Sequence, residues 1–311
     1  MGTIITTRFD TTSPQHLLKD GLVRDIFDTS QRTAKTYYKP LVNDKTTKDE
    51  WIRDLEMAGL ETATELVEGE NIPIFKPTIG TTKDYHQYPF GAGVRMTHKM
   101  QKFNKYELWK RWVGDLAKVQ KEAKDIEVHT VFNSPTSTSL ACGTGFDSTY
   151  PLASASHTGL GAGTAGDYDN YLNAALSISA VEDARYYFAT LVDNMGMYMG
   201  ATATHLVYEP TLHFTAKQIV GSNYVPFEES NTVNIVPEMN LTLYEDPRLT
   251  STTMWFMLAK NDKFNINVFT SQEPDLIIQD APDTTRDRIA TSLQYFGFGW
   301  GCARMYFLGR L

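Results

Sequence analysis

The sequence predicts an α+β fold that is organised around one long helix. The helix is predicted over residues 104–127, where apolar residues recur at steps of three and four. Residues 61–100, just before the helix, have the pattern of two β segments joined by a Pro- and Gly-containing middle. Residues from 234 onward are mostly strand-like as well.

The predicted helix has an apolar face and a charged face. Its apolar stripe consists of Trp109, Trp112, Val113, Leu116, Val119 or Gln120, and Ala123. Its charged face consists of Lys110, Arg111, Asp115, Lys118, Lys121, Glu122 and Lys124. Asn104 followed by Glu107 resembles a capping box. Gly114 in the middle costs about 1 kcal/mol relative to Ala, so packing must hold this rod of about 33 Å straight. We expect both tryptophans to be core residues rather than a ligand platform.

Composition excludes several classes of protein. The chain has 311 residues, enough for two or three lobes, and its net charge of −8 disfavours a nucleic-acid binder that works through basic patches. No apolar run approaches the roughly 18 residues of a membrane span, and the N-terminus lacks the order of a signal peptide. The two cysteines, Cys142 and Cys302, lack metal-site spacing. We expect both to be buried thiols in a reducing compartment.

Residues 1–60 predict an arm with little core of its own. They carry nine basic and nine acidic residues, with short helical patches at 16–27 and 49–57. Such a segment is either an extended arm ordered by its neighbours or a frayed terminus.

The segment 61–100 predicts a long hairpin without a core to pack on. Val94, Met96, His98 and Met100 alternate with polar residues, which is the period of a strand. An isolated two-stranded hairpin is marginal in water. Either another domain or another subunit must therefore cover it, and this is the first indication of assembly.

The middle of the chain predicts a loop followed by a helical lobe. Residues 128–150 are rich in Ser, Thr, Gly and Pro and are expected to be loop. Ser179 and Glu182 then form a second capping-box pattern. The helix face that follows consists of Val181, Ala184, Tyr187 or Phe188, and Leu191. A strand at 205–208 and a helix at 211–220 come next, the helix with Pro210 at its start and Gly221 at its end.

The C-terminal part predicts a return to β structure. The strand-like segments are 234–244, 253–258, 264–270 and 289–306. The stretch AKNDK at 259–263 has the composition of a hairpin turn between two of them. Gly297, Gly299 and Gly301 predict bends or close backbone approach, and Trp300 among them is expected to pack in the interior.

Several stretches occur in a familiar order. They are LASASH at 152–157 followed by Asn170 or Asn173, LSISAVEDA at 176–184, LVYEP at 206–210 with Ala216 and Ile219 after it, DPRLT at 246–250 ahead of WFMLA at 255–259, and EP at 273–274 ahead of YFGFGW at 295–300. Over roughly residues 60–311 this order resembles the major capsid proteins of tailed bacteriophages, which have the Hong Kong 97-type fold. The detailed pattern is most similar to the Mu-like major head subunit group.

The resemblance implies a role for each part of the chain. These roles are an N-terminal arm at 1–60, an extended loop at 61–100 that lies over an adjacent subunit, the spine helix of a peripheral domain at 101–130, an axial domain at 131–232, the β return of the peripheral domain at 233–295 and a return to the axial domain at 296–311. Lys76 and Lys83 lie in the loop region, but nothing in the sequence identifies a cross-linking acceptor.

The resemblance also implies a function. It is that of a major capsid protein, which is not an enzyme and self-assembles through hexamers and pentamers into an icosahedral or prolate shell around double-stranded DNA. The implied location is the virion, after assembly in the bacterial cytoplasm. Implied partners are other copies of the chain, a separate scaffold, a portal, possible decoration proteins and DNA held only by weak nonspecific contact. No membrane, cofactor or metal is implied.

Two other classes of function remain open at this point. An encapsulin-like nanocompartment shares the fold but encloses protein cargo. A β-rich hydrolase would use Ser154, His157 and Asp167, yet no nucleophile elbow surrounds the serine. The Gly161-Ala-Gly163-Thr-Ala-Gly166 stretch matches a dinucleotide fingerprint without the strand that should precede it.

The remaining polar residues also lack the pattern of a catalytic or metal site. The histidines at 86, 98, 129, 157, 205 and 213 lack paired-ligand spacing. We therefore predict no catalytic, cofactor or metal residue. Glu65, Glu68 and Glu70 are expected either to meet basic residues of a neighbouring subunit or to form a solvated acidic face.

Overall fold

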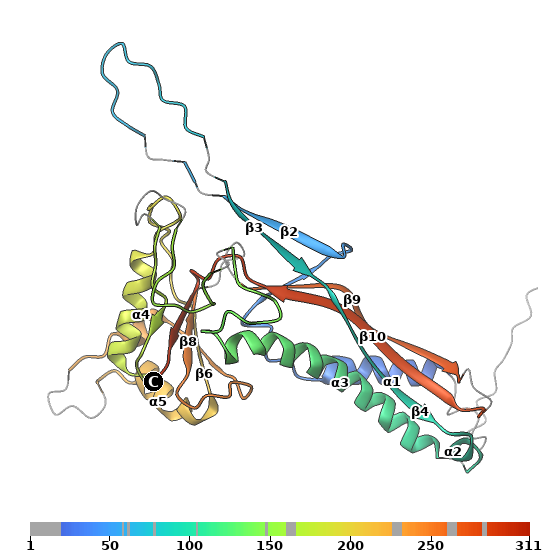
Figure 1. Ribbon diagram of the computed structural model, residues 1–311. Helices are drawn as coiled ribbons and strands as arrows, with labels where there is room; N and C mark the ends of the chain where they lie inside the picture. Colours follow the sequence, from blue (N-terminus) through green and yellow to red (C-terminus); the bar gives the residue numbers. More distant parts are fainter. Residues whose placement is uncertain are drawn as a thin grey trace, which may run out of the picture. The chain divides into compact units, whose positions relative to one another are not determined.

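The computed structural model describes residues 20–57, 59–60, 63–76, 79–103, 105–146, 149–159, 166–225, 232–259, 266–281 and 285–311, and Figure 1 shows the chain. It mixes helices and strands, as predicted. The described chain divides into two compact units. The first contains residues up to 36, 87–126 and 270–296, and the second contains 37–86, 127–269 and 297–311.

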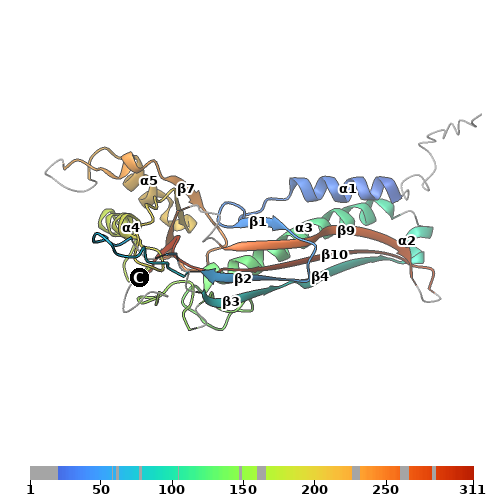
Figure 2. The ribbon, with the colours of Figure 1, turned by 90° about the horizontal axis from the view of Figure 1, so that it is seen from above.

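The first unit packs its two longer helices on a sheet. Its elements are α1 (Asp20–Thr33), β4 (Tyr88–Met96), α2 (His98–Lys102), most of α3 (Tyr106–Asn133) and most of β9 (Asn267–Asp280) and β10 (Arg288–Gly299). Strand β10 pairs antiparallel with β4, from Arg288 opposite Met96 to Phe296 opposite Tyr88. Figure 2 shows β9, β10 and β4 side by side and α1 running along α3.

The core of the first unit lies between α1, α3 and the sheet. Trp109 and Val113 of α3 are at most 1% exposed and pack in one cluster with Val23 and Phe27 of α1. Trp112 packs against the same cluster and is partly buried. The predicted apolar stripe is therefore confirmed at its N-terminal half.

Further along α3, the charged face was predicted wrongly at one position. Lys124 is buried, and its Nζ donates to Thr270 Oγ1 at 2.6 Å. Gln120, rather than Val119, faces the sheet and donates to the Ser292 carbonyl at 2.8 Å. Polar side chains occupy this part of the helix because the sheet offers each of them a partner.

The predicted hairpin at 61–100 is wrong in its pairing. Strand β3 (Ile79–His86) pairs with β2 (Trp51–Met57), and the helical patch predicted at 49–57 is in fact this strand. Seven residues form too short a helix to be stable alone, and pairing with β3 satisfies the backbone of β2. Strand β4 pairs with β10 of its own chain.

The predicted strand alternation to Met100 stops at Met96. Helix α2 follows, because Thr97 Oγ1 accepts from the Met100 N–H at 3.3 Å and Asp287 accepts from the His98 N–H at 2.7 Å. Asn104 lies outside the described residues. Helix α3 continues to Asn133, through part of the predicted loop at 128–150.

The second unit holds a five-stranded sheet and two helices. Its sheet has the order β5-β11-β8-β6-β7, made of β5 (Tyr171–Leu172), β11 (Tyr306–Gly309), β8 (Trp255–Leu258), β6 (His205–Tyr208) and β7 (Thr242–Glu245). The unit also contains β1 (Asn43–Thr46), the β2–β3 pair, α4 (Ile178–Thr190), α5 (His213–Gly221) and 3-10 turns at Pro210–Leu212 and Val236–Met239.

Most predictions for the helices and strand of the second unit are confirmed, and one helix cap is wrong. The face of α4 is confirmed, because Val181, Ala184 and Phe188 are at most 1% exposed. Its cap is Ser177, not Ser179, since the Ser177 hydroxyl accepts from the Ala180 N–H at 3.1 Å. The predicted strand at 205–208 is β6, and the helix predicted at 211–220 is the 3-10 turn followed by α5.

Two β predictions near the C-terminus need correction. The segment 234–244 contains a 3-10 turn before β7, and Asn240 ends that turn with φ of 50°. The hairpin across AKNDK is wrong, because β8 and β9 belong to different sheets. Residues 260–265 lie outside the described part of the chain. The segment 289–306 is split between β10 and β11.

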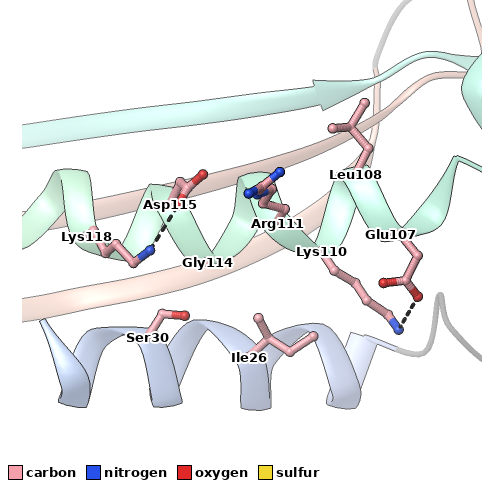
Figure 3. A pocket seen from close by; sticks show the side chains of 9 residues that line it. All are labelled: Ile26, Ser30, Glu107, Leu108, Lys110, Arg111, Gly114, Asp115 and Lys118. Atoms are coloured by element: carbon pink, nitrogen blue, oxygen red, sulfur yellow. Dashed lines mark hydrogen bonds and ion pairs between the residues drawn. The ribbon is translucent and has the colours of Figure 1, made fainter.

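Gly114 marks the place where α1 crosses α3. A Cβ built there would lie 3.0 Å from Ser30 Oγ and 3.7 Å from Ile26 Cγ2 of α1 (Figure 3). The helical cost of this glycine is therefore offset by close approach of the two helices.

We predict that Gly114→Leu lowers the free energy of unfolding by about 1–3 kcal/mol, because an overpacked crossing must open. The measurement is thermal and urea unfolding followed by far-UV circular dichroism. Gly114→Ala is the control: it gains about 1 kcal/mol in helix propensity, and a hydroxyl can rotate away from its methyl group. Identical unfolding of the Leu variant and the parent would contradict the crossing.

Candidate assembly interface

Strands β2 and β3 form a two-stranded ribbon with little cover. In β2 every residue is exposed or partly exposed, and in β3 only Tyr85 is buried. A pair of strands has no core between its two faces. The side chains of this ribbon are thus available for contact with another molecule.

The tip of the ribbon, described over residues 59–60 and 63–76, is apolar and exposed. Ile74 is 93% exposed, Ile72 77% and Val67 74%. The exposed apolar side chains of ribbon and tip are Trp51, Leu55, Met57, Leu60, Leu66, Val67, Ile72, Ile74 and Ile79. Contiguous exposed apolar residues on this scale mark an interaction surface in a folded protein.

The tip is also acidic. Glu65, Glu68 and Glu70 are exposed, as the sequence predicts. Glu70 accepts a hydrogen bond from the Val67 N–H at 3.0 Å, which closes a turn. For Glu65 and Glu68 we find no hydrogen bond or ion pair to other residues that the structure describes. A partner of this tip should therefore offer apolar surface together with positive charge.

The base of the ribbon is held firmly, in contrast to its tip. The Tyr85 ring packs on Phe269 at 5.0 Å between centroids, and Gly299 approaches it so closely that a Cβ would lie 2.9 Å from the ring. Lys83 Nζ donates to the Cys142 carbonyl at 2.6 Å. Burial lowers the pKa of this lysine, and we assign it to anchoring the ribbon.

Glycines make the anchor possible. The Phe146 N–H donates to the Gly301 carbonyl at 2.8 Å, and Thr81 of β3 donates to the Phe146 carbonyl. A Cβ on Gly301 would lie 2.5 Å from the Phe146 ring. The predicted close approach at Gly299 and Gly301 is thereby confirmed, and Trp300 between them is buried as expected.

One cross-strand ion pair stiffens the ribbon. Arg53 of β2 is directly opposite Asp84 of β3, and both guanidinium–carboxylate contacts measure 2.7 Å. Their hydrogen bond raises the pKa of Arg53 and lowers that of Asp84. The guanidinium also lies 4.9 Å from the Trp51 ring. Because the pair is exposed, it fixes geometry more than it adds stability.

The hydrolase candidates are not assembled into a relay. Ser154 Oγ donates to the Ser156 carbonyl, and Asp167 accepts from the Gly159 N–H at 2.7 Å. The His157 ring stacks on Tyr168 at 4.4 Å, with Nε2 3.1 Å from Asn170 Oδ1. All three side chains thus serve local structure. Within the dinucleotide-like stretch only Gly166 is described, and it has φ of 83°.

A buried arginine connects the loops around these residues. The Arg304 guanidinium donates to the carbonyls of Val192 at 2.8 Å and Gly166 at 2.7 Å, and to Asn194 Oδ1 at 2.5 Å. It also lies 4.4 Å from the Tyr168 ring. This side chain is 1% exposed, and its role could not be predicted from the sequence because a single arginine before β11 has no distinguishing pattern.

The DPRLT stretch holds the C-terminal end of α3. Asp246 Oδ2 lies 2.8 Å from His129 Nε2, and both side chains are almost fully buried. Asn133 donates to the Arg248 carbonyl at 3.1 Å and accepts from the Thr250 N–H at 2.9 Å. The extension of α3 beyond the predicted end depends on these contacts.

Other candidate sites are weak. Among the described residues, no group of three His, Cys, Asp or Glu side chains could hold a metal ion. Cys142 and Cys302 are half-buried rather than fully buried, and burial raises the pKa of the Cys142 thiol to about 11.

Within the described ranges no helix is long and apolar enough to cross a membrane.

The sequence of residues 80–307 matches the family model described as "Phage capsid protein". The chain belongs to this phage capsid protein family. The prediction of a phage capsid protein is thus confirmed, and the protein is a capsid shell protein. The Mu-like subgroup stays a prediction. No curated protein matches the chain in sequence.

Solved capsid structures share the fold at low sequence identity. The capsid of cyanophage P-SCSP1u has a TM-score of 0.59 at 10% identity, covering 89% of this chain and 88% of that one. The virus-like particle from Pyrococcus furiosus has a TM-score of 0.54 at 6% identity, covering 93% and 98%. The empty GTA particle capsid has a TM-score of 0.55 at 8% identity, covering 89% of each chain. These likenesses confirm the predicted capsid fold, and nothing in them favours the encapsulin-like alternative over the phage capsid.

We predict that Arg304→Lys lowers the free energy of unfolding by about 1–3 kcal/mol, because an ammonium cannot reach all three acceptors and leaves a buried one unpaired. The measurement is thermal unfolding with near-UV circular dichroism. Arg310→Lys, a matched change on a half-buried side chain, should leave the midpoint unchanged. Equal effects of the two substitutions would refute the bridging role of Arg304.

Proposed function

We propose that this capsid protein is the major head subunit that closes, through hexamers and pentamers, into an icosahedral or prolate shell around double-stranded DNA. The observation that carries the proposal is the ribbon, whose base is anchored and whose apolar tip is uncovered. Anchoring at one end leaves the apolar side chains of the tip in solvent, so that a neighbouring copy can supply the missing burial.

The energetic argument is that ordering the tip costs conformational entropy that its own contacts do not offset. Fixing a backbone residue costs about 1–2 kcal/mol, and burial returns about 25 cal/mol per Å² of apolar surface. In a single chain the exposed tip gains little free energy from burial of apolar surface. In a closed shell, repeated heterologous contacts around the symmetry axes supply this burial.

The domain roles follow from the same proposal, with several boundaries moved. The extended loop consists of β2, the tip and β3, so it covers residues 51–86 rather than 61–100. The first unit, which includes β4, corresponds to the peripheral domain with α3 as its spine, and α4, α5 and the five-stranded sheet correspond to the axial domain. Strands β7 and β8 of that sheet, predicted within the peripheral β return at 233–295, therefore move to the axial domain.

The net charge of the chain is compatible with a shell that encloses DNA without binding it tightly. The net charge of −8 repels phosphate, so contact with packaged DNA is weak and nonspecific. A separate scaffold, a portal and decoration proteins complete the proposal, with assembly in the bacterial cytoplasm before the protein resides in the virion.

The direct test is to express the chain with and without its neighbouring head genes and to examine the product by cryo-electron microscopy and sedimentation. Closed shells or capsomer rings are expected. A product that remains monomeric under every condition would overturn the proposal.

We predict that a shortened ribbon abolishes assembly but not folding. Met57 and Ile79 are already paired across the ribbon. Replacing residues 58–78 by Asn-Gly connects these two residues by a two-residue hairpin turn. Sedimentation should shift from shells to small species, while thermal unfolding stays within a few degrees of the parent.

Thr64→Ser, a conservative change at an exposed position of the full-length tip, serves as the control and should assemble normally. Shells of ordinary size from the shortened chain would show that the tip is dispensable.

A further inference from the structure

The loop at residues 191–199, which follows α4, is tightly hydrogen-bonded within itself. The Asp193 carboxylate accepts from the N–H groups of Met195 at 2.8 Å and Met197 at 2.9 Å. The Asp193 N–H donates to the Met197 carbonyl at 2.8 Å, and Gly196 takes the left-handed turn conformation with φ of 82°. The loop therefore offers a fixed surface to any segment that packs on it.

The ribbon contacts this loop where its tip begins. Asn194 Nδ2 donates to Glu56 Oε1 of β2 at 3.1 Å. A Cβ built on Gly59 would lie 3.5 Å from Met197 Cε and 3.9 Å from Met195 Cγ, which is ordinary van der Waals distance. Loop and ribbon both belong to the second unit. The ribbon is thus held at a second place, beyond the contacts of its base.

The Arg304 guanidinium determines which way the Asn194 amide points. A guanidinium can only donate hydrogen bonds, so its contact of 2.5 Å with Asn194 is made by the amide oxygen. The amide nitrogen then faces Glu56, whose ionised carboxylate can only accept. The donors therefore run in one direction, from a buried cation through a neutral amide to a carboxylate. Hydrogen bonds in such a chain polarise and strengthen one another.

Asparagine is suited to position 194 because its two neighbours make opposite demands. The amide oxygen satisfies the cation, and the amide nitrogen satisfies the anion. An aspartate of the same shape would still accept from Arg304, but it would place a second negative charge beside Glu56. Asn194 and Glu56 are both half-buried, so solvent would screen this repulsion only in part.

We propose that Asn194 is a positioning residue for assembly, which fixes the direction of the ribbon by coupling Glu56 to the buried Arg304. This rests on the proposed function, and it concerns how the ribbon is oriented within its own subunit. A ribbon that is already held in one direction loses less conformational entropy when subunits associate. The coupling should therefore favour assembly.

Spin labels measure the direction of the ribbon in dissociated subunits. One label is attached at Ile79→Cys on β3 and the other at Tyr186→Cys on α4, which are both exposed positions, in a background with Cys142→Ser and Cys302→Ser. Double electron–electron resonance should give one narrow distribution of distances in the parent. Asn194→Asp should broaden or shift this distribution, because the repulsion releases the ribbon from the loop.

A donor–acceptor swap separates the coupling from other effects of the substitution. Glu56→Gln alone should behave as the parent, because its amide oxygen still accepts from Asn194. Combined with Asn194→Asp, it should restore the narrow distribution, because the glutamine then donates to the aspartate. The matched control is Asn173→Asp, which adds the same charge at an exposed position of the second unit and should leave the distribution unchanged.

Shell yield, measured by sedimentation, tests the consequence for assembly. Asn194→Asp should reduce the yield about tenfold, since like charges in contact disfavour the oriented ribbon. The combined variant with Glu56→Gln should restore most of the yield. The thermal unfolding midpoint of Asn194→Asp should stay within a few degrees of the parent, because the aspartate still accepts from Arg304.

Three results overturn the proposal. The first is an unchanged distance distribution in Asn194→Asp, and the second is a change that the added Glu56→Gln does not relieve. The third is normal shell yield from Asn194→Asp although the distribution has changed. The proposed function fails separately, when the parent chain itself forms no shell. In that case the distance measurement still decides whether Asn194 orients the ribbon.

Discussion

Exposure of the apolar ribbon tip is the constraint on which the proposed assembly depends. Within one chain, Ile72 and Ile74 face solvent almost completely, although residues of their type are usually buried. Contacts at the base hold the ribbon to its own unit, among them the Tyr85–Phe269 ring contact and the hydrogen bond from Lys83 to the Cys142 carbonyl. The fold thus leaves an apolar segment exposed at the end of an anchored ribbon, and we propose that another copy covers it.

The two units hold their shape by different means. In the first, α3 packs apolar residues at one end and buried Gln120 and Lys124 at the other. In the second, polar groups connect segments that are distant in sequence. Asn170 alone donates to the Leu152 carbonyl at 2.9 Å and accepts from the Ser154 N–H at 2.9 Å. Such buried networks specify one arrangement when every member has a partner.

The family could be predicted from the order of weak motifs, and α3 and α4 from their apolar periodicity. The pairing of β2 could not, because WIRDLEM carries both apolar and charged residues at either period. Register depends on a partner strand that lies 22 residues further on, from Met57 to Ile79. Likewise Lys124 belongs to the charged face by composition, and only Thr270 opposite it makes burial favourable. The hydrogen bonds of Arg304 and Asn194 join segments far apart in the sequence, and no local pattern encodes them.

The most direct measurement of the central claim is the rate of maleimide labelling at Ile74→Cys, read by peptide mass spectrometry in assembled shells and in dissociated subunits. If a neighbouring copy covers the tip, labelling in shells should be at least tenfold slower than in free subunits. Equal rates in the two states would show that the tip remains in solvent after assembly, and would contradict the account.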